Sequence, residues 1–121
     1  MIECIVVGLG GMIGAVCRYL MGLIPLKEGM DFPVKTLAVN IIGAFAIGII
    51  VAVAAKHPNL NPRLVLFLKT GVCGGVTTFS TFALETGDLI KSGNPTAAVL
   101  YIVLSLVLGI GAVFAAQAMV K

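Results

Sequence analysis

The amino-acid sequence predicts an all-α membrane protein, a single domain of residues 1–121 that crosses the bilayer as four helices. Of its residues, 60% are hydrophobic and only 11% are charged, whereas ordinary soluble domains are about 45–50% apolar and about 25% charged. A chain of 121 residues has a large surface for its volume, and these charges are too few to cover that surface for water. We therefore exclude a soluble enzyme, a disordered linker and a nucleic-acid-binding protein.

The spacing of the apolar segments defines the four helices in order. A helix needs about 20 mostly apolar residues to cross the hydrocarbon of a bilayer. The first segment runs from Cys4 to Ile24 and contains one charged residue, Arg18. The second runs from Thr36 to Ala55 and contains none.

The third and fourth segments meet the same length requirement. The third runs from Leu64 to Leu84 and carries one charge, Lys69, near its start. The fourth begins near Pro95, a favourable residue in a first helical turn, and extends to Val120 without a charge. We expect a multi-pass protein of the cell's inner or plasma membrane, with the lipid bilayer as its solvent.

The cations are divided evenly between the two sides of the membrane. With four spans, both termini and the second loop share one side. The cations predicted on that side are Lys56, Arg63, Lys69 and Lys121, and those on the other side are Arg18, Lys27, Lys35 and Lys91. An excess of Lys and Arg normally sets the orientation, so this balance gives no preference. Either one span is misplaced, or the chain inserts both ways and pairs with an inverted copy.

Small residues are spaced for close contact between helices. The glycines in question are Gly10 and Gly14, Gly71 and Gly75, and Gly109 and Gly111. Pairs of small residues four apart let helix backbones approach closely in lipid. The cysteines are Cys4, Cys17 and Cys73. They form no CxxC pair, and we expect them to be small buried packing residues.

Asn40 lies inside the cleanest apolar segment, with Thr36 one turn earlier on the same face. A buried amide in hydrocarbon must find hydrogen-bond partners or destabilise the fold by several kcal/mol. One interpretation is a hydrogen bond to another helix. The other is a pore donor, because an amide NH2 offers two hydrogens to a passing anion.

The third span contains a segment, residues 71–82, that is unfavourable for a regular helix. The adjacent glycines Gly74 and Gly75 each weaken a helix by about 1 kcal/mol. Four hydroxyl residues within five positions, at 77, 78, 80 and 81, can bond to the backbone and open it. We expect a break here. Its freed carbonyls can ligate a small hard cation, or the helix is merely kinked.

Further polar and aromatic residues share faces of the third and fourth spans. Phe79 and Phe82 are three apart, so their ring edges, which are electropositive, can meet a small anion, or the rings contact lipid and core.

Tyr101 and Ser105 are four apart and can donate hydroxyl hydrogens, while Glu85 lies near a membrane surface. Contact between helices or anchoring at the interface are the alternatives for these three. Arg18 beside Tyr19 is typical of an interfacial anchor, although pairing with a carboxylate or attraction of anions also fits it.

Three motifs together resemble the CrcB/Fluc family of fluoride channels: residues 10–19 (GGMIGAVCRY), 36–43 (TLAVNIIG) and 74–82 (GGVTTFSTF). The resemblance extends over all four spans in order. It implies passive export of cytoplasmic fluoride, which relieves fluoride toxicity, and it implies no enzymatic activity and no nucleic-acid partner. It further implies an antiparallel, dual-topology homodimer with two pores and a central structural sodium ion.

The resemblance also assigns roles to individual residues. Asn40 is similar to the family's pore asparagine, and Phe79 and Phe82 are similar to the paired phenylalanines that line the pores. The backbone carbonyls of Gly74 and Thr77 correspond to the sodium ligands. The polar track beyond the phenylalanines would consist of Thr36, Tyr101 and Ser105, with Glu85 at its mouth. At Gly109, where some members carry a further hydroxyl, this sequence has none.

Two other classes of function compete with a channel. A small proton-coupled multidrug exporter needs a carboxylate within the membrane, but Asn40 stands at the centre of the second span and Glu85 lies late in the third. A helper or assembly subunit would pass no ions by itself. An enzyme would need a nucleophile–base pair or a metal cluster, and the sequence suggests neither.

Overall fold

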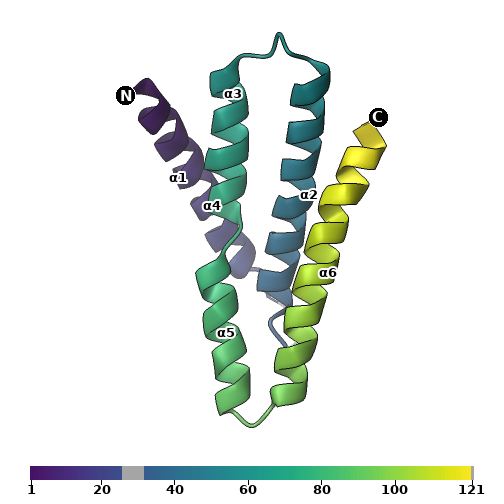
Figure 1. The fold of residues 1–121 in the computed structure, drawn as a ribbon. Coiled ribbons are helices and arrows are strands. Elements are labelled where there is room, and N and C mark those ends of the chain that lie inside the picture. The colour runs from purple at the N-terminus through teal and green to yellow at the C-terminus, as the bar shows by residue number, and fades with distance from the viewer. Residues whose placement is uncertain (26–31, 121) are drawn as a thin grey trace.

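The computed structural model of the protein describes residues 1–25 and 32–120, in which every regular element is a helix (Figure 1). The elements are α1 (Ile2–Gly22), α2 (Val34–Lys56), α3 (Pro62–Leu66), the π-helix η1 (Phe67–Cys73), α4 (Gly74–Val76), α5 (Phe79–Lys91) and α6 (Pro95–Val120). Two of the cations counted above, Lys27 and Lys121, lie outside the described residues.

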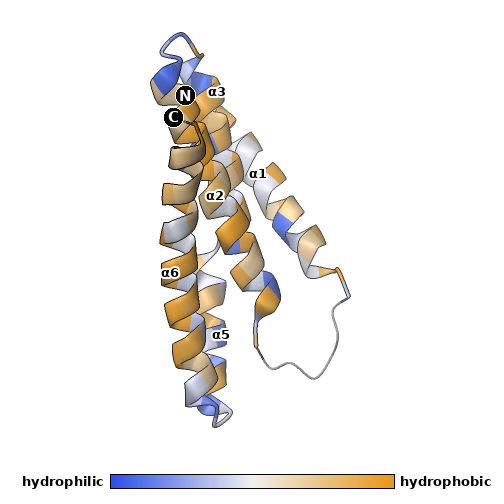
Figure 2. Cartoon of the chain, turned by 90° about the vertical axis from the view of Figure 1, so that its right-hand side faces the viewer, coloured by the Kyte–Doolittle hydropathy of each residue, from blue (hydrophilic) through white to orange (hydrophobic). Residues whose placement is uncertain are grey.

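Four helices are long and apolar enough to cross a membrane, and they confirm the predicted all-α fold and its four spans. The spans are Ile2–Gly22, Val34–Lys56, Pro62–Lys91 and Pro95–Val120. The third comprises α3, η1, α4 and α5. Hydrophobic residues run along most of each helix (Figure 2), and many large hydrophobic side chains are exposed on the outside of the chain. The protein is therefore a multi-pass membrane protein.

The helix ends follow from local chemistry. Asn61 caps α3 by accepting a hydrogen bond from the Arg63 N–H at 2.9 Å, and Pro62 stands in the first turn. Gly93, with φ +81°, makes the turn before α6, which begins at Pro95 as predicted.

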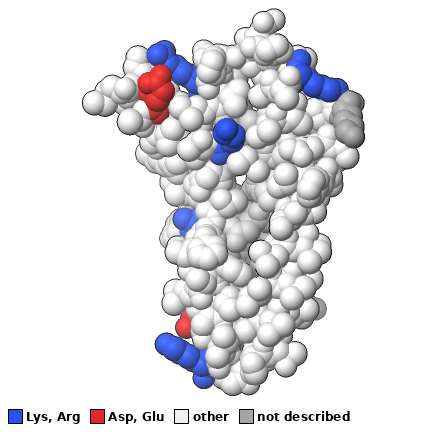
Figure 3. Space-filling view, viewed as in Figure 1, with Lys and Arg blue, Asp and Glu red and all other residues white. Residues whose placement is uncertain are grey.

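The two termini and the loop between α2 and α3 lie at one end of the bundle, and the loop between α5 and α6 lies at the other (Figure 1). This is the arrangement that an even number of spans requires. Most charged side chains on the face in Figure 3 lie toward these two ends, which leaves a largely uncharged belt between them.

The first and third spans pack backbone to backbone through their glycines. A Cβ atom on Gly10 would lie 2.6 Å from the Phe67 carbonyl oxygen and 2.9 Å from the Gly71 Cα. A Cβ on Gly75 would lie 2.6 Å from the carbonyl oxygen of Gly11. The expected close contact between these glycine pairs is confirmed.

Some other small residues make no such contact within this chain. No atom lies within 4 Å of a Cβ placed on Gly109 or Gly111; the close approach of α2 to α6 instead occurs at Gly48, beside Ala116. Cys73 is buried as expected, but Cys4 and Cys17 are exposed. These two cysteines lie on the outer face of α1, and the sequence pattern does not distinguish the two faces of an apolar helix.

Replacing Gly10 by Ala should destabilise the protein. The added methyl meets fixed backbone atoms rather than a flexible side chain, and such overpacking costs about 1–3 kcal/mol. Gly8→Ala is the matched control because nothing lies within 4 Å of its Cβ. We expect a lower midpoint of unfolding in detergent for Gly10→Ala alone, and equal midpoints for the two variants would contradict the backbone contact.

Candidate functional site

The third span is interrupted after α4. Thr77 (φ −82°, ψ 154°) and Thr78 (φ −149°, ψ 120°) are extended, and α5 starts at Phe79. The predicted break is therefore confirmed, but it follows the adjacent glycines rather than occurring at them. Gly74 and Gly75 remain helical, and Gly75 serves the close contact with α1.

Asn40 satisfies the backbone of the break with both ends of its amide. Its Nδ2 donates to the Thr78 carbonyl oxygen at 3.1 Å, and its Oδ1 accepts from the Thr78 N–H at 2.7 Å. The predicted hydrogen bond to another helix is thus confirmed. An amide NH2 has two hydrogens, so this pairing leaves one for another acceptor.

Other side chains form hydrogen bonds and close contacts at the break. The Thr77 hydroxyl donates to the Cys73 carbonyl oxygen at 3.0 Å. The Thr78 hydroxyl caps α5 by accepting from the Thr81 N–H at 3.2 Å. A Cβ on Gly43 would collide with the Thr77 methyl group. Sequence reasoning assigned no role to Gly43, although it lies three residues after Asn40 on the helix face that meets the break.

The carbonyl groups before the break are satisfied unevenly. The Gly75 oxygen accepts from Arg18 Nε at 3.3 Å. Within residues 1–25 and 32–120, the carbonyl oxygens of Gly74 and Thr77 accept no hydrogen bond. Arg18 therefore contacts α4 just before the break, a role that the interfacial-anchor interpretation missed. Its place four residues after Gly14 is the signal that could have revealed the contact.

A central hollow of about 280 Å³ lies beside the break. It is lined by Asn40, Thr77, Thr78, Phe79, Phe82, Ser105, Leu106 and Gly109. The Ser105 hydroxyl oxygen is buried and has no hydrogen-bond partner among the described residues. Phe79 is 79% exposed, and its ring centroid lies 5.9 Å from that of Phe82. The structure thus brings together Asn40, both phenylalanines and Ser105, and it adds no cationic side chain to them.

Tyr101 lies behind this hollow rather than in its lining. It is fully buried, with its ring centroid 4.9 Å from that of Phe82 and 5.5 Å from that of Phe32. Its hydroxyl donates to Glu85 Oε1 at 3.0 Å. The hydrogen bond joins α5 to α6, as the alternative interpretation of Tyr101 and Glu85 expected.

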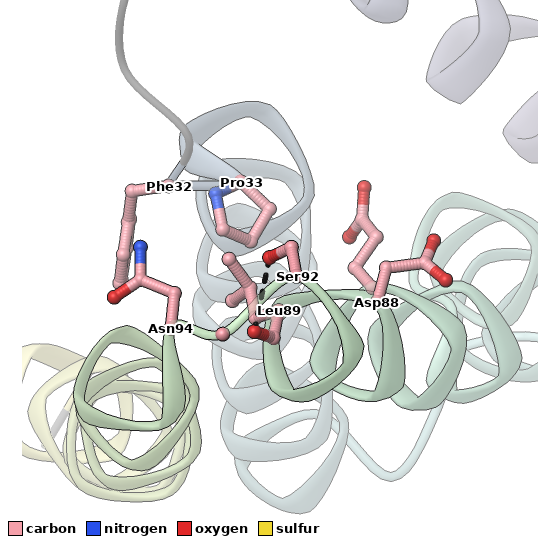
Figure 4. A pocket seen from close by; sticks show the side chains of 8 residues that line it. Phe32, Pro33, Asp88, Leu89, Ser92 and Asn94 are labelled. Atoms are coloured by element: carbon pink, nitrogen blue, oxygen red, sulfur yellow. Dashed lines mark hydrogen bonds between the residues drawn. The ribbon is translucent and has the colours of Figure 1, made fainter.

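Glu85 and Thr36 line two further hollows. Glu85 belongs to an end pocket of about 600 Å³, where Asp88 and Asn94 lie on opposite sides (Figure 4). Thr36 is buried and lines a hollow of about 270 Å³. The other residues of that hollow are Arg18, Tyr19, Gly22, Leu23, Lys35, Val39, Thr78 and Thr81. Thr78 lines both this hollow and the central one.

Asn40→Ala should loosen the break. It leaves the Thr78 N–H and carbonyl unpaired, and each unsatisfied buried group costs about 1–3 kcal/mol. We expect a lower unfolding midpoint and faster hydrogen exchange in a peptide covering residues 74–82. Asn59→Ala, in the exposed loop after α2, is the control. Unchanged exchange in Asn40→Ala would show that the amide does not hold the break.

The chain is similar in sequence to a known family along nearly its whole length. The family described as "CrcB-like protein, Camphor Resistance (CrcB)" matches residues 5–117. A protein of Agrobacterium fabrum named fluoride-specific ion channel FluC is 46% identical over 120 residues, which cover 98% of this chain and 96% of the relative. Proteins of the same name from Chlorobaculum tepidum and Methanopyrus kandleri are 43% and 41% identical over 117 residues. These alignments cover 97% and 96% of this chain, and 93% and 87% of the relatives.

Proposed function

The chain belongs to the CrcB family, and on that premise we propose that it is a fluoride-selective ion channel of the inner or plasma membrane. It lets cytoplasmic fluoride leave passively and so relieves fluoride toxicity. The names of its relatives support a channel and give no support to a multidrug exporter or an enzyme. The observation that carries the proposal is the central hollow, whose lining combines neutral donors with two phenylalanine rings.

The donors in this hollow suit fluoride, which is small and strongly hydrated. The second hydrogen of the Asn40 amide and the unpartnered Ser105 hydroxyl can replace part of the lost water. The lining contains no Lys or Arg. Conduction requires binding weak enough for the ion to leave, and neutral donors meet that condition better than a fixed cation.

Phe79 and Phe82 complete the coordination with their electropositive ring edges. Phe79 is largely exposed on the single chain, so its edge is available to an ion or to a second copy. Thr36 lines the hollow of about 270 Å³, which shares Thr78 with the central hollow, so Thr36 continues the polar lining beyond Thr78. Tyr101 packs against the ring of Phe82 from outside the hollow and so supports its position. Glu85 lies in the end pocket, which is the proposed mouth of the pore.

The proposed assembly is an antiparallel, dual-topology homodimer with two pores. The balance of four cations against four that the sequence predicts gives no preference for one orientation. Phe79, which lines the central hollow, is 79% exposed on the single chain, and a second copy would cover it. Inverted partners would each supply one such hollow, which gives two pores.

A structural sodium ion belongs to the same proposal. The carbonyl oxygens of Gly74 and Thr77 have no hydrogen-bond partner in the described ranges. Carbonyl oxygens can replace the hydration shell of an alkali cation. Gly74 is exposed, and no atom lies within 4 Å of a Cβ placed on it, so a second copy has room to approach. These residues fit a cation held between two subunits, where its charge would help to join the dimer.

Passive transport is sufficient for this function. Fluoride enters cells as neutral HF and dissociates near neutral pH, so the anion accumulates inside. A negative-inside membrane potential favours exit of an anion by about 2.3 kcal/mol per 100 mV. Export therefore needs no ATP.

The proposal predicts selective ion release from liposomes that contain the purified protein. Fluoride should leave rapidly when potassium and valinomycin carry the balancing charge, and chloride should be retained, as followed with ion-selective electrodes. Folded, dimeric protein that releases no fluoride would contradict the channel and favour a helper subunit.

The ring-edge role predicts that Phe79→Ile and Phe82→Ile each slow fluoride release at least tenfold while the dimer persists. Isoleucine keeps an apolar side chain but removes the electropositive edge. Phe114→Ile is the matched control, because Phe114 is 68% exposed on α6 and does not line the hollow. Normal release from the double variant would exclude the rings from the pore.

Dual topology predicts equal labelling from both sides of the membrane. In a background with Ser at positions 4, 17 and 73, Asn59→Cys and Ser92→Cys place single thiols in loops at opposite ends of the bundle. An impermeant maleimide applied to intact cells should label about half of each variant. Complete labelling of one and none of the other would establish a single orientation.

A further inference from the structure

Arg18 reaches from α1 to the backbone of the interrupted third span. Its Nε donates to the Gly75 carbonyl oxygen at 3.3 Å, between residues 57 positions apart in the sequence. The contact is partly buried. Among the described residues Arg18 forms no ion pair with a carboxylate. The polar contact of its side chain is the hydrogen bond to the Gly75 carbonyl.

The Gly75 carbonyl is free because of the break. In a continuous helix it would accept the N–H four residues later, that of Phe79. Phe79 instead opens α5 after two extended residues, and no hydrogen bond joins the two groups. A carbonyl freed at membrane depth must find another donor, and Arg18 provides it.

The close glycine contact brings Arg18 within reach. Gly14 lies one turn before Arg18 on α1, and a Cβ on Gly14 would lie 3.0 Å from the Gly75 Cα. The face of α1 formed by Gly10, Gly14 and Arg18 therefore follows the third span, first by backbone contact and then by a hydrogen bond. An interfacial anchor would not require this register.

From this geometry we infer that Arg18 is a positioning residue for the proposed channel. Its hydrogen bond holds the end of α4 before the break, while Asn40 holds Thr78 within it. Thr77 lies between these two points, and Gly74 directly precedes the first of them. The carbonyls of Gly74 and Thr77 are the proposed sodium ligands. Arg18 sets the direction of these carbonyls without touching the ion. The inference rests on the proposed function for its effect on sodium and fluoride, but the hydrogen bond itself can be tested alone.

Three substitutions separate the hydrogen bond from the charge. Arg18→Gln places a neutral N–H donor at the same number of bonds from the backbone as Nε. Arg18→Met has similar length and no donor. Arg18→Lys keeps the charge but places its nitrogen one bond farther out. Each variant is compared with the wild type in the same lipid.

Three measurements are made on each variant. The first is hydrogen exchange of a peptide covering residues 74–82, and the second is the sodium concentration that gives half of the maximal thermal stabilisation. The third is fluoride release from liposomes. The first needs neither sodium binding nor conduction.

We expect Arg18→Met to speed exchange in this peptide roughly fivefold to tenfold, as loss of one hydrogen bond implies, to raise the half-saturating sodium concentration and to slow fluoride release. Arg18→Gln should stay within about twofold of the wild type in all three, and Arg18→Lys should resemble Arg18→Met. If Arg18→Met does not fold, the difference between Arg18→Gln and Arg18→Lys in the three measurements decides whether the hydrogen bond or the charge of Arg18 matters.

Two results would overturn the inference. If Lys preserves the three properties and Gln does not, Arg18 acts through its charge. If every variant behaves as the wild type, the hydrogen bond has no positioning role. A wild-type protein that passes no fluoride, with the expected pattern of exchange, would instead contradict the proposed function and leave the contact to Gly75 standing.

Discussion

The structure depends on one constraint: backbone groups freed by a break inside the membrane cannot be left to lipid. Lipid offers no hydrogen bonds, and each unsatisfied group costs several kcal/mol. Thr77 and Thr78 are extended within the third span, so backbone groups at the break need partners from outside that span. The Gly74 and Thr77 carbonyls, the proposed sodium ligands, accept no hydrogen bond among the described residues. Asn40 pairs with both polar backbone groups of Thr78, and Arg18 takes the carbonyl of Gly75. Side chains of α1 and α2 thus supply hydrogen bonds to backbone groups that the interruption of the third span leaves without helical partners.

The glycines are what allow these partners to reach the break. Gly10 and Gly14 bring α1 into backbone contact with η1 and α4, and Gly43 leaves room on α2 for the Thr77 side chain. The interruption in turn places Asn40, Phe79 and Ser105 around one hollow. The Asn40 amide therefore holds the break through its oxygen and one hydrogen, and in the proposed channel its second hydrogen donates to fluoride. In the proposed channel one residue, Asn40, therefore has both a structural role and a conducting role.

The sequence alone was sufficient for the features that depend on composition and spacing. Long apolar segments predicted the four spans, and Pro95 marked the start of the last. The glycine and hydroxyl pattern predicted the break but not its position, because the glycines are retained in the helix for packing. The sequence could not distinguish the outer face of a uniformly apolar helix from the inner one, so Cys4 and Cys17 were wrongly expected to be buried. The partner of Arg18 is a backbone carbonyl, which no residue type marks, so only the spacing of Arg18 from Gly14 could have suggested this contact.

In the proposed channel the second Asn40 amide hydrogen donates to fluoride, and a distance measurement between the two can detect this contact. Solid-state NMR of protein carrying 15N-labelled asparagine, with Asn59, Asn61 and Asn94 replaced by Asp, isolates the Asn40 side-chain nitrogen. In the presence of fluoride we predict dephasing of this signal by 19F at hydrogen-bond distance. Absence of dephasing in a protein that still conducts fluoride would show that the anion passes without contact with Asn40.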